Sequence, residues 1–195
     1  MIAVATSGAS MAETTEECSI PTYGSFGDVT SIALKVPGVL TSGQDKTAEQ
    51  TAVGTAVTSW EHTCGRYKLP SLHMANEKGR EFYNDTPLPQ GTEIWKLRRG
   101  THKEIGTYGV RSTRGLCALA RPEQKEVIWY TAVDENRSLI DRCQEVVVMI
   151  HEMGHMVRLE DMDDSSVYTQ WCMATSLMGT AESIQTEDCK KVDEK

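Results

Sequence analysis

The stretch from Ser138 to His155 constrains the fold most, because its pattern predicts a single long amphipathic helix. Ser138 and Asp141 form a Ser-x-x-Asp pair, close to the capping box that is typical of helix N-termini. Small or apolar residues then recur at three- and four-residue steps, namely Leu139, Cys143, Val146, Val147, Ile150 and Gly154. Such spacing places them on one stripe of a helix, so the pattern predicts that this stripe is buried.

The same helix contains the run His151-Glu152-Met153-Gly154-His155. Two histidines four residues apart lie on one helix face, so both imidazoles can reach one metal ion. Zinc lowers the pKa of a bound water from about 15.7 to about 7, and Glu152 lies where it can accept the proton of that water. His-Glu-x-x-His arises by chance in roughly one in a hundred such sequences, so a third ligand is needed to support a zinc site.

Asp161, six residues beyond His155, is the candidate for that third ligand. A tetrahedral catalytic zinc takes three protein ligands and leaves one position for water. The extended run resembles the motif of the metzincin metallopeptidases, His-Glu-x-x-His-x-x-Gly-x-x-His/Asp, and its Asp ending resembles the snapalysin-like branch. The resemblance implies a zinc endopeptidase in which His151, His155 and Asp161 hold Zn²⁺. Glu152 is then expected to assist the attack of zinc-bound water on the scissile peptide bond.

The chain departs from the family motif at Arg158, which stands where metzincins have glycine. In the family this glycine ends the active-site helix with a sharp turn that returns the third ligand to the metal. A left-handed backbone conformation costs a residue with a side chain about 1 kcal/mol or more. We therefore expect either a strained turn or a different third ligand. The acidic alternatives are Glu160, Asp163 and Asp164, with Glu182 and Glu187 farther along the chain.

Two further segments resemble metzincin features. Ser176-Leu177-Met178-Gly179 resembles the turn that places a methionine beneath the metal, with Met173 as the rival and plain core packing as the alternative for either methionine. Residues 115–120 and 127–130 resemble the edge strand of the family and the strand that follows it. An exposed edge strand offers main-chain hydrogen bonds to a peptide substrate, whereas the alternative is an ordinary hairpin.

The remaining patterns predict an α+β fold, and the resemblance implies that this fold is metzincin-like. We expect a small twisted, mostly parallel sheet with a backing helix and the active-site helix, followed by a short C-terminal lobe with the methionine turn and a last helix. The expected strands are 28–36, 93–97, 116–120 and 127–131, the other helices are 47–63 and 186–194, and 65–92 is irregular because of its Pro and Gly residues. Residues 1–27 are expected to form an extended N-terminal arm and residues 28–195 a single catalytic domain, with lobes of about 28–157 and 158–195.

The charge of the chain limits its partners. Lys plus Arg number 20 and Asp plus Glu number 28, so the formal net charge is −8. This balance argues against nucleic acid, whose binding normally needs a basic face, and against an anionic membrane surface. No apolar run approaches the roughly 18 residues of a membrane span. We expect a monomer whose partner is a protein or peptide substrate.

The cysteines bear on the compartment. The chain has 6 of them, spread over its whole length and without a Cys-x-x-Cys pair, at positions Cys18, Cys64, Cys117, Cys143, Cys172 and Cys189. An even, dispersed set suits up to three disulfides, so we expect an extracellular protein whose secretion signal is absent from this chain. The alternative is a cytoplasmic protein with buried thiols. Cys18 is expected in a disulfide, although a free thiolate there could occupy the open position of a zinc site.

Two other functions fit the same residues. One is a catalytically inactive, zinc-stabilised binding or inhibitory module of the same fold, in which Arg158 has distorted the third ligand. The other is a disulfide-stapled domain in which His-Glu-x-x-His is a coincidence. The first alternative predicts bound zinc without peptide cleavage, and the second predicts no bound metal.

Overall fold

The computed structural model describes residues 18–38, 45–100, 104, 117–130, 145–162, 172, 176–178 and 181–194. Within them the chain forms an α+β fold of five strands, three α-helices and one short 3₁₀ helix. The strands are β1 (Ser31–Lys35), β2 (Ser71–Ala75), β3 (Thr92–Arg99), β4 (Ala118–Arg121) and β5 (Glu126–Trp129). The helices are α1 (Ala48–Cys64), η1 (Pro122–Gln124), α4 (Glu145–Met156) and α6 (Thr186–Asp193).

The strands form one sheet in the order β2-β1-β3-β5-β4. The β1–β2, β1–β3 and β3–β5 pairs are parallel, and only β4 runs antiparallel to its neighbour β5. The expected mostly parallel sheet is thereby confirmed. Strand β4 lies at one edge of the sheet and forms an antiparallel hairpin with β5, so the segment has the features of both alternatives expected for residues 115–130.

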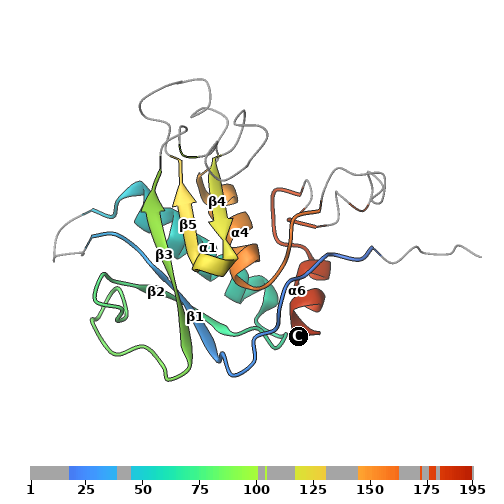
Figure 1. Ribbon diagram of the computed structural model, residues 1–195, viewed down its shortest axis with the longest axis horizontal. Helices are drawn as coiled ribbons and strands as arrows, with labels where there is room; N and C mark the ends of the chain where they lie inside the picture. The colour runs from blue at the N-terminus through green and yellow to red at the C-terminus, as the bar shows by residue number, and fades with distance from the viewer. Residues whose placement is uncertain are drawn as a thin grey trace, which may run out of the picture.

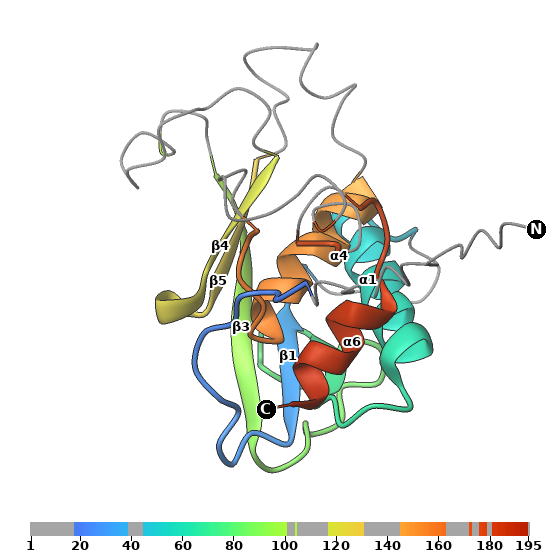
Figure 2. The ribbon, with the colours of Figure 1, turned by 90° about the vertical axis from the view of Figure 1, so that its right-hand side faces the viewer.

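All three α-helices lie on the same side of the sheet (Figures 1 and 2). The alternation of buried and exposed side chains along β3 explains why the helices cover only one face of the sheet. Glu93, Trp95 and Leu97 are buried, whereas Ile94 and Lys96 between them are exposed. Successive side chains of a strand point to opposite faces, so the buried set faces the helices and the exposed set faces solvent.

Helix α1 begins with the expected capping box, in which Thr47 and Gln50 bond each other's backbone N–H groups. Its apolar side packs against α4. There the indole N–H of Trp60, which is fully buried, donates to the carbonyl of Ile150 at 2.9 Å. This hydrogen bond joins the backing helix to the middle of the helix that carries the His-Glu-x-x-His run.

The structure corrects one prediction and limits another. Residues 65–92 are not wholly irregular, because Ser71–Ala75 form β2 in parallel register with β1. The buried Leu72 and Met74 flank the more exposed His73 there, but Pro70 and the Gly/Pro-rich surroundings obscure that short pattern. Helix α4 is described from Glu145, so the expected start at Ser138 lies outside the described residues.

Segments distant in the sequence are joined by disulfides. Cys18 bonds Cys172 and Cys64 bonds Cys189, across 154 and 125 residues, and Cys117 is disulfide-bonded as well. The second bridge links the end of α1 to α6.

In the described part of the chain, no helix combines the length and apolar character that crossing a membrane requires.

Candidate metal site

Helix α4 presents both histidines on one face, with ring centroids 5.3 Å apart. His151 Nδ1 lies 3.0 Å from the carbonyl oxygen of Leu177, and His155 Nδ1 lies 2.9 Å from that of Leu159. A carbonyl oxygen only accepts hydrogen bonds, so each Nδ1 carries a proton and donates it. Both Nε2 atoms therefore face away from these carbonyls, in the orientation that metal-ligating histidines usually have.

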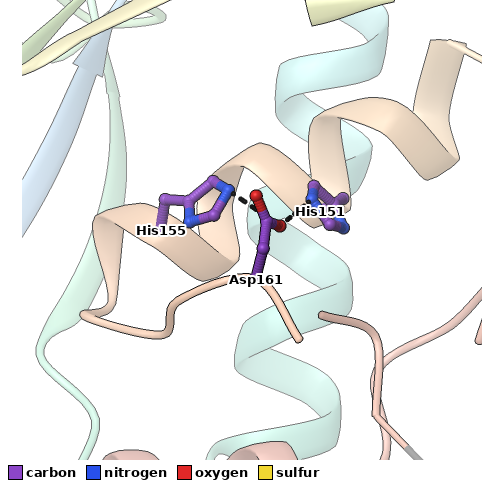
Figure 3. A group of neighbouring side chains, drawn as sticks. All are labelled: His151, His155 and Asp161. Atoms are coloured by element: carbon purple, nitrogen blue, oxygen red, sulfur yellow. Dashed lines mark hydrogen bonds and ion pairs between the residues drawn. The ribbon is translucent and has the colours of Figure 1, made fainter. Parts of the chain in front are cut away.

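Asp161 completes a cluster with the two histidines (Figure 3). Its Oδ1 lies 3.0 Å from Nε2 of His151 and 3.4 Å from Nε2 of His155. One ligand atom from each side chain lies within 4.8 Å of the others, so the group could hold a metal ion. Two ligands of a tetrahedral zinc, each about 2.0–2.1 Å from the ion, are about 3.3 Å apart, which is close to the two distances between Asp161 Oδ1 and the Nε2 atoms.

The end of α4 explains how Asp161 comes back to the histidines. Leu159 N donates to the Gly154 carbonyl and Arg158 N to the His155 carbonyl, both at 3.0 Å. These two bonds form a Schellman motif, which places Arg158 at the position that usually needs glycine. Arg158 indeed has a left-handed φ of 73°. The expected turn is thus present without the glycine, and Asp161 lies three residues beyond it.

Electrostatics favours charged forms of all three side chains. Burial alone would lower the pKa of His151, but the hydrogen bond to Asp161 and the nearby carboxylates outweigh it and raise this pKa to about 9. The same balance raises the pKa of His155. Burial also acts against ionisation of Asp161, yet the hydrogen bonds from the two histidines hold its pKa well below the usual range. A metal ion would displace the shared protons, so binding should strengthen as pH rises.

Glu152 lies beside this cluster and is buried, with only 6% of its surface exposed. Its Oε2 atom has no hydrogen-bond partner among the described residues. Burial raises the pKa of this carboxyl, and the nearby charges of His155 and His151 oppose the increase. A backbone hydrogen bond from Ala120 ties the carboxyl to strand β4. A buried oxygen without a partner needs explanation, and a reacting water is one.

Met178 lies beneath the helix, on the short turn at residues 176–178. Its sulfur lies so close to Gly154 that a Cβ atom at that glycine would be 2.4 Å away. Met178 N donates to Ser176 Oγ, and the Met178 carbonyl accepts from Met162 N. The turn is held from α6, because the buried Asp188 carboxylate accepts bonds from Ser176 Oγ and Leu177 N.

The sequence did not indicate that Glu93 supports the site. Arg158 is 8% exposed, and its Nη2 lies 2.9 and 2.8 Å from the two carboxylate oxygens of Glu93. Tyr23 also contributes, since its hydroxyl donates to the His155 carbonyl and its N–H to the Arg158 carbonyl. One signal was present: the expected strand 93–97 places Glu93 on the same face as Trp95 and Leu97, which predicts a buried carboxylate in need of a partner.

The acidic candidates that the structure describes besides Asp161 are not part of the cluster. Among the residues that the structure describes, the one group able to hold a metal contains neither Glu160 nor Glu182 nor Glu187, and the last of these pairs with Lys190. Asp163, Asp164 and Met173 lie outside the described residues. Cys18 is in a disulfide, as expected, so its thiol does not serve as a metal ligand.

The comparisons with known proteins give no family assignment. A scan against protein-family models found no match to the chain, and a search of curated proteins found none either. The functional argument therefore depends on the residues of this chain and their geometry.

Proposed function

We propose that the chain is a zinc-dependent endopeptidase of metzincin type. The observation that carries the proposal is the convergence of three ligand atoms, from His151, His155 and Asp161, next to the buried carboxyl of Glu152. A structural metal site has no need for a buried acid with an unpartnered oxygen. A hydrolytic site does, because a water molecule must be held and deprotonated there.

The donor set fits zinc. Two imidazole nitrogens and one carboxylate oxygen are ligands that Zn²⁺ accepts, and three protein ligands leave the fourth position open, as in catalytic sites. The carbonyls of Leu177 and Leu159 fix both histidines with Nε2 toward the site. When bound, zinc lowers the pKa of water and polarises a carbonyl oxygen.

Glu152 is the proposed general base. Its Oε2 would accept a proton from the attacking water and return that proton to the leaving amine of the peptide. Burial raises the pKa of this carboxyl, which makes its ionised form a better base than an exposed glutamate. The hydrogen bond from Ala120 holds the carboxyl in place while the proton moves.

Strand β4 is the proposed support for a peptide substrate. It is one of the two edge strands of the described sheet, and its Ala120 is bonded to the proposed general base. An extended peptide added along this edge would gain main-chain hydrogen bonds and lie next to Glu152. We propose an extracellular setting as well, because the two long-range disulfides suit an oxidising compartment.

The test measures zinc content and peptide cleavage in the same preparations. Protein is purified without chelator or metal-affinity resin, its zinc per chain is determined by elemental analysis, and cleavage of a fluorescence-quenched peptide library is followed. The parent should contain about one zinc and cleave peptides. Glu152→Ala should keep the zinc and lose turnover by at least about a hundredfold. Asp161→Ala should lose both zinc and turnover.

Three outcomes would contradict the proposal. Full activity in Glu152→Ala would show that Glu152 is not the general base. Bound zinc in a parent that cleaves no peptide would favour the inactive zinc-stabilised module. A parent that binds no zinc, even when zinc is added back, would leave the His-Glu-x-x-His run as a coincidence.

A further inference from the structure

The left-handed turn at Arg158 is held by contacts that a glycine would not need. A side-chain-bearing residue in this conformation persists only when its surroundings determine it. Glu93 Oε1 and Oε2 both accept from Arg158 Nη2, at 2.9 and 2.8 Å, with side chains that are only 5% and 10% exposed. The guanidinium carbon also lies 5.9 and 5.5 Å from the ring centroids of Tyr23 and Phe26, within cation–π range.

Glu93 is itself fixed to the sheet. Trp95 Nε1 donates to its Oε1 at 2.7 Å, and Lys125 Nζ lies 2.9 Å from its Oε2. Burial would raise the pKa of Glu93, but the hydrogen bonds from Arg158, Lys125 and Trp95 lower it to about 2. The carboxylate is therefore an anion at neutral pH, held on β3 in the middle of the sheet.

The backbone on both sides of Arg158 links this ion pair to the metal cluster. The carbonyl of Leu159, the next residue, accepts from Nδ1 of His155. Asp161 lies two residues farther along, against Nε2 of both histidines. A change of backbone conformation at residue 158 would move two contacts of the site at once.

We propose that Glu93 is a positioning residue for the metal site: its ion pair with Arg158 holds the left-handed turn that orients Asp161 and His155, in place of a glycine. The inference rests on the proposed function only in that the cluster binds zinc. A buried ion pair is a poor source of net stability, because desolvation offsets much of the attraction, but it can select one conformation. Here it selects the conformation in which Asp161 faces the histidines.

The test is a double-variant cycle on zinc affinity. Zinc Kd is measured by competition with a chromophoric chelator for the parent, Glu93→Gln, Arg158→Gly and the double variant, each shown to be folded by circular dichroism. Glutamine keeps an oxygen for Trp95 but loses the charge. Glu93→Gln should weaken zinc binding about tenfold or more, as for other residues that orient metal ligands. Arg158→Gly and the double variant should both stay within about threefold of the parent, because glycine adopts this turn unaided.

A metal-independent readout reports the turn itself. The amide of Leu159 is bonded to the Gly154 carbonyl only while the turn is formed. Hydrogen exchange at this amide should be faster in Glu93→Gln than in the parent, and Glu93→Gln/Arg158→Gly should restore protection. Lys125→Gln is the matched control, since it removes another cation from Glu93 without touching the turn. Its zinc Kd should equal that of the parent.

A second pair of variants covers the case in which Glu93→Gln does not fold. Arg158→Ala and Arg158→Gly both remove the guanidinium, but only alanine resists the left-handed conformation. Zinc should bind about tenfold more weakly to Arg158→Ala than to Arg158→Gly. Equal Kd values in this pair would overturn the inference, as would an effect of Glu93→Gln that is the same with Arg158 and with glycine. A parent that binds zinc but cleaves no peptide would overturn the proposed peptidase alone.

Discussion

Single residues around α4 determine which atoms meet at the site. The Nδ1 protons of His151 and His155 are donated to backbone carbonyls, so only the Nε2 atoms face Asp161. Gly154 lies between the two histidines because Met178 occupies the space that a side chain there would need. Its role is therefore steric, whereas Arg158 shows that a left-handed turn can be held without glycine.

Gly154→Ala should destabilise the protein. The new Cβ would lie 2.4 Å from the sulfur of Met178, so the turn beneath the helix must shift. Overpacking of this kind costs about 1–3 kcal/mol in the free energy of unfolding, which outweighs the better helix propensity of alanine. Urea unfolding monitored by circular dichroism measures the effect.

Gly54→Ala on α1 is the matched control. There the nearest atom to a new Cβ is the hydroxyl of Tyr83 at 3.1 Å, at the end of an exposed side chain that can move aside. The helix propensity gain should leave this variant as stable as the parent or up to about 1 kcal/mol more stable. Equal effects of the two substitutions would contradict the steric role of Gly154.

Glu93 should give the fold a specific acid sensitivity. Its pKa is about 2 in the folded chain, below the usual value of 4.5. A carboxyl with a lowered pKa contributes stability above its unfolded pKa, and this contribution is lost as pH falls from about 4.5 through 2. The difference in unfolding free energy between the parent and Glu93→Gln should therefore be about 2–3 kcal/mol smaller at pH 2 than at pH 6. A constant difference over that range would show that the carboxylate charge contributes nothing.

At the level of elements, α6 supports the site although it contributes no ligand. Asp188 on α6 accepts from Ser176 Oγ at 2.6 Å and from Leu177 N at 3.0 Å, and it also caps its own helix through Gln185 N. The Leu177 carbonyl in turn fixes His151. The helix therefore positions His151, a proposed metal ligand on α4, through one buried carboxylate and one turn.

Asp188→Ala should loosen this connection. Alanine removes the acceptor that Ser176 Oγ, Leu177 N and Gln185 N share, so these donors lose their partner. An unsatisfied buried donor costs about 1–3 kcal/mol, so urea unfolding should show a loss of this size. Zinc Kd should rise about tenfold, since His151 loses its orienting carbonyl. Glu187→Gln, on the exposed side of α6, should change neither quantity.

Across the molecule as a whole, covalent bridges connect segments from both halves of the chain to the core. Cys64–Cys189 joins α1 to α6, and Cys18–Cys172 joins the N-terminal segment to residue 172, between α4 and α6 in the sequence. The N-terminal segment then runs along the turn that follows α4, where Thr22 bridges Leu159 and Glu160 N donates to the Pro21 carbonyl. Parts of the chain that lie more than a hundred residues apart thus meet beside the site.

Removing Cys64–Cys189 should lower stability without altering the site. The bridge spans 125 residues, and a loop of that size predicts a loss of about 2–5 kcal/mol in Cys64→Ala/Cys189→Ala. Denaturant unfolding measures this loss, and zinc Kd should be unchanged. Cys18→Ala/Cys172→Ala should lower stability similarly but also weaken zinc binding, because Cys18 anchors the segment next to Arg158. Identical zinc affinities for both variants would contradict this distinction.

Short-range patterns made much of the fold predictable. The helices at 47–63 and 186–194, the strand at 28–36 and the edge strand near 116–120 correspond to α1, α6, β1 and β4. Capping boxes and alternating apolar residues are local signals, so they can be recognised within a few residues. Strand β2 was missed because its five residues carry a weak pattern and gain their hydrogen bonds from β1, some forty residues away.

Local sequence was enough to place two histidines and a glutamate on one helix, because helix periodicity is a property of consecutive residues. Spacing also indicated Asp161, but not that the chain would turn back at Arg158. That turn depends on Glu93, 65 residues away, and the orientation of His151 depends on the Leu177 carbonyl across 26 residues. The packing of the whole chain determines these partners. A buried charge or ring nitrogen needs a hydrogen-bond partner, and it can bond only to a group that the fold brings within hydrogen-bond distance.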